Sequence, residues 1–87
     1  MGHFRLKGIF TKEEEFIEII EFYLSGKLVK YSYSFIKQGT CILRYDNAPH
    51  HKSLKTFPHH KHYKEIIREL KTPNLKEFVK ELIELRK

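Results

Sequence analysis

The stretch LVKYSYSFIK, residues 28–37, decides the fold of this chain. Aromatic and β-branched side chains alternate there with short polar or charged ones, the period-two pattern of a strand with one buried face. Turn residues precede it at 25–27 and follow it at 38–40, and each turn offers a glycine for the positive φ of a tight hairpin. The stretch therefore predicts a central strand of an antiparallel sheet, in which Val29, Tyr31, Tyr33 and Phe35 alternate with Lys30, Ser32 and Ser34.

Segments on both sides extend this sheet. Residues 40–46 return as the next strand, with Ile42 or Leu43 and then Tyr45 toward the core. Residues 3–10 alternate apolar and charged side chains, which predicts a first strand with two unlike faces.

Residues 11–24 allow two interpretations. Thr11 followed by Glu14 is a capping-box pattern, and glutamates recur at helical spacing opposite apolar side chains. This periodicity favours an amphipathic helix. The same segment is rich in isoleucine and aromatic residues, which strands prefer. If residues 12–14 form a turn, residues 15–24 become a strand that returns along residues 3–10.

The end of the chain predicts a helix over residues 74–86. Asn74 and Glu77 form a capping box, and apolar residues recur at i, i+3, i+4 and i+7. Residues 64–70 before it would be a last strand or a short helix. The predicted fold class is α+β, an antiparallel sheet of about four to five strands with this helix packed on one face. The covering stripe would be Leu75, Phe78, Val79, Leu82 and Ile83.

Composition narrows the class of protein. At 87 residues the chain is one domain, 1–87, with a small core. A single cysteine, Cys41, excludes an internal disulfide and indicates a reducing, cytoplasmic setting. No apolar run reaches the roughly 20 residues that span a bilayer, so no membrane association is expected. The net charge of +6 favours a polyanionic partner, either nucleic acid or an acidic protein.

Residues 44–62, RYDNAPHHKSLKTFPHHKH, concentrate the side chains that can do chemistry. Pro49 and Pro58 would each end regular strand pairing. The segment is therefore predicted to be one loop on a sheet edge, with residues 46–47 as its entry turn. Of the six histidines of the chain, the loop holds His50, His51, His59, His60 and His62.

Cleavage of RNA without a metal is the first interpretation of this loop. Histidine, with a pKa of about 6.5, can take a proton from the attacking 2′-hydroxyl and give one to the leaving oxygen. The proton-transfer groups would be His60 and His62, with His50, His51 and His59 as alternates. Asp46 would orient a histidine or the loop. Arg44, Lys52 and Lys61 would bind phosphate, and Tyr45 and Tyr63 would stack on bases.

Two other interpretations of the loop remain. Zinc is commonly held by three or four nitrogen and oxygen ligands, here His50, His51, His60 and His62, although no recognised spacing motif is present. Alternatively, the histidines only hydrogen-bond the loop to the sheet.

Several of these stretches resemble the TumE family, toxins of type II toxin–antitoxin systems. The resemblance rests on RYDNAPHH at 44–51 and FPHHKH at 57–62, with LVKYSYSF at 28–35 and PNLKEF at 73–78 beside them. It extends over roughly residues 3–85. It implies a small α+β domain with the motif on a strand-end loop, favours a strand over residues 15–24, and implies a cognate antitoxin as partner.

The leading hypothesis is therefore a toxin that acts as a small, basic, metal-independent endoribonuclease on RNA or ribosome-bound mRNA. The ribonuclease part comes from the residues and not from the family. The alternative is a non-enzymatic module that binds nucleic acid or a partner protein, either metal-free or stabilised by a metal through the histidine cluster. A third hypothesis is an inactive toxin that keeps its antitoxin contact through its basic surface. An unpaired edge strand at 3–10 would also pair with a partner or with a second copy in a homodimer.

Overall fold

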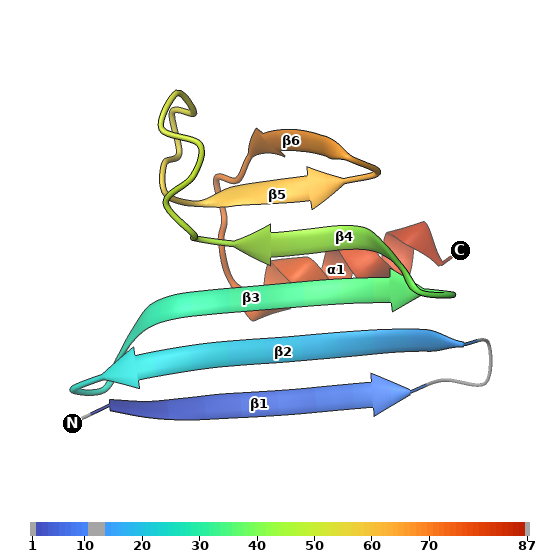
Figure 1. Ribbon diagram of the computed structural model, residues 1–87, viewed down its shortest axis with the longest axis horizontal. Helices are drawn as coiled ribbons and strands as arrows, with labels where there is room; N and C mark the ends of the chain where they lie inside the picture. Colours follow the sequence, from blue (N-terminus) through green and yellow to red (C-terminus); the bar gives the residue numbers. More distant parts are fainter. Residues whose placement is uncertain (1, 11–13, 87) are drawn as a thin grey trace.

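The computed structural model describes residues 2–10 and 14–86. Over these residues, six strands form one antiparallel meander in chain order and a single helix follows (Figure 1). This arrangement confirms the predicted α+β class. The elements are β1 Gly2–Phe10, β2 Glu15–Leu24, β3 Lys27–Lys37, β4 Thr40–Asp46, β5 His60–Tyr63, β6 Ile66–Glu69 and α1 Leu75–Leu85.

The strand interpretation of residues 15–24 is confirmed, and the helix that periodicity favoured is wrong. β2 pairs with β1 from Phe16 to Leu24 on one side, and with β3 along its whole length on the other. Two partner strands satisfy its backbone groups, so tertiary pairing overrides the helical spacing of the glutamates. The capping box that began at Thr11 lies outside the described residues.

The predicted single loop over residues 44–62 is wrong at both ends. Residues 44–46 belong to β4, and His60 begins a further strand, β5, which pairs with β4. The loop therefore spans residues 47–59. The predicted strand over 64–70 also begins too early, because Lys64 and Glu65 both have positive φ and form a hairpin turn before β6.

Register divides the sheet into two faces. Residues directly opposite each other in an antiparallel sheet share a face, and Tyr33 lies opposite both Ile19 and Tyr45. Helix α1 packs on this side, which we call the helix face, near β3 and β4 (Figure 1). Phe78 is fully buried there, with its ring centroid 5.8 Å from Tyr33 and 5.3 Å from Tyr45. We call the other side the open face.

Helix α1 begins as predicted but packs along a narrower stripe. The Asn74 side-chain oxygen accepts a hydrogen bond from the Glu77 N–H at 2.9 Å, as an N-cap should. Phe78 and Leu82 are buried and Leu75 and Leu85 pack beside them. The predicted burial of Val79 and Ile83 is wrong, because they are 42% and 55% exposed. No helix of the described residues is long and apolar enough to cross a membrane.

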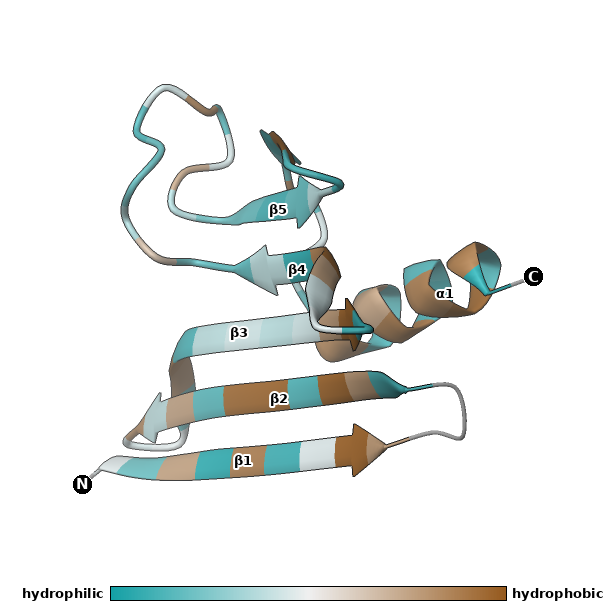
Figure 2. Cartoon of the chain, turned by 45° about the vertical axis from the view of Figure 1, so that its right-hand side comes forward, coloured by the Kyte–Doolittle hydropathy of each residue, from teal (hydrophilic) through white to brown (hydrophobic). Residues whose placement is uncertain are grey.

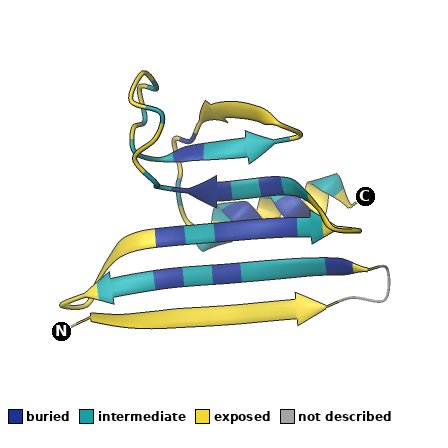
Figure 3. Ribbon diagram, in the orientation of Figure 1, coloured by how far each residue is buried: buried dark blue, intermediate teal, exposed yellow. Residues whose placement is uncertain are grey.

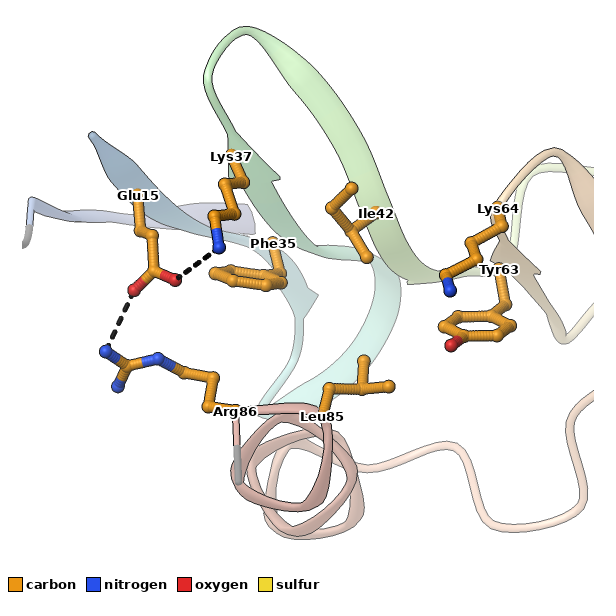
Figure 4. Close-up of a pocket in the computed structure, with 8 residues that line it drawn as sticks. All are labelled: Glu15, Phe35, Lys37, Ile42, Tyr63, Lys64, Leu85 and Arg86. Carbon is orange, nitrogen blue, oxygen red and sulfur yellow. Dashed lines mark ion pairs between the residues drawn. The ribbon is translucent and has the colours of Figure 1, made fainter. Parts of the chain in front are cut away.

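A hollow of about 420 Å³ lies on the helix face, beside the C-terminal end of α1 (Figure 4). The buried Glu15 carboxylate stands at its side, 2.9 Å from an Arg86 guanidinium nitrogen and 4.0 Å from Lys37 Nζ. These ion pairs tie the start of β2 to the end of the helix. The residues that line the hollow are Glu15, Phe35, Lys37, Ile42, Tyr63, Lys64, Leu85 and Arg86.

Candidate functional site

A buried carboxylate–imidazole pair lies on the open face, where β4 ends and β5 begins. Asp46 ends β4, His60 begins β5, and the register sets them opposite each other. His60 Nε2 lies 2.8 Å from Asp46 Oδ1, and the His60 side chain is only 2% exposed. Its Nδ1 lies 3.0 Å from the Pro58 carbonyl oxygen, which can only accept, so this nitrogen carries a proton. Both ring nitrogens of His60 are therefore engaged within the protein.

Asp46 also shapes the start of the loop. Its Oδ1 accepts a hydrogen bond from the Ala48 N–H at 3.0 Å, the pattern of an Asx turn. The next residue, Asn47, accepts from the Tyr31 N–H and donates to the Val29 carbonyl, both at 3.0 Å. The amide side chain thus continues the β3–β4 pairing past the end of β4 and fixes where the loop departs.

His62 lies two residues beyond His60 and on the same face, but its environment differs. Its Nε2 lies 3.6 Å from Asp46 Oδ2, beyond hydrogen-bond distance, and its side chain is 34% exposed. Burial lowers the pKa of His62, against the opposing pull of Asp46, and the nearby His60, Arg44 and His51 lower it further. The ring is therefore neutral at neutral pH and can accept a proton.

His51 comes from the loop and completes a cluster of three imidazoles. Its ring centroid lies 4.8 Å from His60 and 5.8 Å from His62, each in an edge-to-face arrangement. One potential ligand atom from each of the three lies within 4.8 Å of the others. Ligands of a tetrahedral zinc stand about 3.3 Å apart, and His60 would have to give up an existing hydrogen bond. Metal binding by this cluster therefore requires the rings to close in.

Arg44 places a permanent positive charge beside the cluster. It lies directly across from His62 in the β4–β5 pair, so both side chains are on the open face. Its Nε donates to the Ser34 hydroxyl at 2.9 Å, and Ser34 is fully buried. The contact holds one edge of the guanidinium to β3. Ser34 was not predicted as a site residue, although the polar row of β3 that contains it is visible in the sequence.

A model of the TumE toxin family matches residues 2–86 of the chain. The chain belongs to the TumE toxin family. No curated protein and no solved structure matches it significantly. Membership in a TumE toxin family implies an antitoxin partner in general terms. In this TumE structure the signature at 44–51 and 57–62 runs from β4 through the loop into β5.

The other two histidines of the TumE signature, His50 and His59, lie outside the cluster of His51, His60 and His62. His59 Nδ1 lies 2.9 Å from the Tyr31 hydroxyl, and the two rings stack with centroids 5.8 Å apart. This contact holds the end of the loop to β3. His50 is exposed, with its ring 6.5 Å from that of His51, and Lys52 is exposed in the same loop.

Three of the residues predicted to contact RNA lie on the helix face, away from this cluster. Lys61 Nζ lies 3.0 Å from each carboxylate oxygen of Glu81 on α1, and the Tyr45 hydroxyl donates to the same carboxylate. Tyr63 lines the hollow at the helix end (Figure 4). Alternation along β4 and β5 separates them from Arg44, His60 and His62, because neighbouring residues of a strand point to opposite faces.

Proposed function

We propose that this TumE toxin is a metal-independent endoribonuclease that cleaves RNA on the open face, with His62 as general base. The observation that carries the proposal is the contrast within one carboxylate–histidine group. His60 is buried with both nitrogens engaged, whereas His62 is accessible and has a lowered pKa. A neutral, reachable imidazole beside an arginine is suited to accept a proton next to a phosphate.

In the proposed reaction, neutral His62 accepts the proton of a ribose 2′-hydroxyl as that oxygen attacks the adjacent phosphorus. The bond from phosphorus to the 5′-oxygen breaks, and the leaving oxygen takes a proton from the protonated form of His51. The products are a 2′,3′-cyclic phosphate and a free 5′-hydroxyl. Arg44 lies opposite His62 and would stabilise the charge that builds on the phosphate oxygens.

Asp46 and His60 act in this proposal as positioning residues. Asp46 joins the loop backbone, through Ala48, to the buried His60 ring. Its second oxygen faces His62 and favours the imidazolium that forms when His62 accepts a proton. Loss of either residue would misplace His62 and remove part of that stabilisation.

The proposal is tested by incubating the purified protein with single-stranded RNA in EDTA, with and without ribosomes. Wild type should cleave, and His62→Ala should lose about 10²–10⁴-fold in rate, the usual contribution of a general base. His50→Ala is the matched control, because His50 is an exposed histidine of the same loop. Intact RNA with wild type in both settings, or equal rates for wild type and His62→Ala, rules the proposal out.

The second candidate is a non-enzymatic module stabilised by zinc through His51, His60 and His62. The convergence of these three histidines within 4.8 Å favours it. Elemental analysis of the same preparation separates the two candidates. Stoichiometric zinc whose removal lowers the melting temperature, together with no RNA cleavage, supports the second and contradicts the first.

A further inference from the structure

Strand β1 is exposed along its whole length (Figure 3). Among the described residues it pairs with β2 alone and lies at one edge of the sheet. Every second residue of such a strand directs its backbone N–H and C=O away from the sheet, where an added strand can bond to them. The edge is therefore open to a seventh strand.

One row of β1 side chains forms an apolar surface. Phe4, Leu6 and Phe10 lie on the open face and are 66%, 69% and 81% exposed. The Phe4 and Phe10 rings pack against Phe22 and Phe16 of β2, each with centroids 4.7 Å apart. Gly8 completes the row: a Cβ there would lie 2.6 Å from the Phe16 ring, which occupies that space. Figure 2 shows hydrophobic residues recurring along both strands.

The other row of β1 is basic and lies on the helix face. It contains His3, Arg5 and Lys7, which lie opposite Tyr23, Glu21 and Ile19, and it ends with the apolar Ile9. Arg5 has one nitrogen 3.5 Å from the buried Glu21 carboxylate, yet its side chain stays 54% exposed. A partner strand would thus meet apolar side chains on one face and positive charge on the other.

From these two rows we infer that β1 binds an extended segment of the antitoxin as a seventh strand, and that the segment alternates apolar and acidic residues. Its backbone would pair with the free edge of β1, its apolar side chains would extend the row of Phe4 and Leu6, and its carboxylates would face Arg5 and Lys7. The inference rests on the toxin role of the proposed function and the antitoxin that this role implies. It does not depend on the chemistry of the histidine cluster.

Charge favours this partner over a second copy of the chain. A two-fold axis through Leu6 would set Arg5 opposite Lys7 of the other copy, and like charges directly opposite destabilise a strand pair. RNA would meet the basic row but would leave the apolar row and the free backbone groups uncovered. An acidic, apolar strand satisfies all three features.

The test uses two synthetic peptides of about nine residues, one alternating Glu with Val and one alternating Lys with Val. Fluorescence anisotropy should show that wild type binds the Glu peptide at least about tenfold more tightly than the Lys peptide. The double variant His3→Glu/Lys7→Glu should reverse this preference and leaves the Arg5–Glu21 contact in place. Leu6→Asn should weaken binding of the Glu peptide about tenfold, while its melting temperature stays unchanged.

Equal affinity for the two peptides, or a preference that His3→Glu/Lys7→Glu leaves unchanged, overturns the inference. A wild-type dimer in sedimentation that Leu6→Asn dissociates also overturns it, in favour of a second copy. If Leu6→Asn loses RNA binding and still binds the Glu peptide as wild type does, the inference is also overturned, and RNA is the partner of β1. RNA cleavage measured alongside keeps the two proposals separate, since each of cleavage and peptide binding can fail while the other persists.

Discussion

His62 and His60 both face the Asp46 carboxylate, and of the two only His62 is accessible to solvent. The difference follows from their neighbours. His60 lies between Asp46 and the Pro58 carbonyl, within hydrogen-bond distance of both. His62 stands 3.6 Å from the carboxylate and is partly exposed. The buried part of its surroundings lowers its pKa. Residues at i and i+2 of a strand point to the same face, so the sequence places the two rings together once β5 is known, but it does not show which of them is buried.

The lowered pKa of His62 makes a prediction about stability and pH. In the unfolded chain this imidazole has a pKa of about 6.5 and protonates first as the pH falls. The contribution of His62 to the free energy of unfolding is therefore full above about pH 6.5 and is lost as the pH falls through its folded pKa. Urea denaturation should show that the free energy of unfolding of wild type, minus that of His62→Gln, becomes smaller as the pH falls from 7.5 to 5.

Subtracting the free energy of unfolding of His62→Gln from that of wild type removes the contribution of the other groups that titrate in this range. His50→Gln is the matched control, because it removes an exposed histidine of the same loop that lies outside the cluster. A wild-type minus His62→Gln difference that is equal at both pH values would show that folding does not lower this pKa.

At the scale of elements, the sequence predicts those whose burial has a regular period. Strand β3 alternates aromatic and polar residues, and the buried stripe of α1 recurs at helical spacing, so both were predicted near their observed bounds. Strand β5 reads HKHY and carries no apolar alternation, because its open-face side chains bury against Asp46 and not against a core. The contacts of His60 and His62 are polar and reach Asp46 of β4, and a single sequence gives no signal for them.

Helix α1 supplies the second prediction. Phe78→Ala should destabilise the protein by about 3–5 kcal/mol, because it removes a fully buried ring packed on Tyr33 and Tyr45. Val79→Ala is the matched control on the next residue, 42% exposed, and should cost less than about 1 kcal/mol. Chemical denaturation measures both. Similar losses for the two variants would mean that the helix is rotated from the packing described.

At the scale of the whole molecule, the two faces of the sheet carry different groups of side chains. The helix face holds the core, the ion pairs to α1 and the hollow at its end. The open face holds the histidine cluster and Arg44, and at its far edge the apolar row of β1. Because strands β4 and β5 contribute side chains to both faces, adjacent residues of the TumE signature lie in different environments. Sequence proximity alone therefore grouped Lys61 with Arg44, and the pleat of the sheet separates them.

This division leads to the last prediction, a comparison of two cations from the same strand pair. Arg44→Gln on the open face should lower kcat/KM for single-stranded RNA about 10²-fold, because it removes the positive charge that lies directly across from His62 in the β4–β5 pair. Lys61→Gln on the helix face should leave kcat/KM within about twofold and should cost about 0–1 kcal/mol of stability, as its partly exposed pair with Glu81 is lost. Melting temperatures of both variants confirm that each is folded. Equal losses of cleavage would mean that RNA responds to net charge rather than to the open face, and would count against the histidine cluster as the site of reaction.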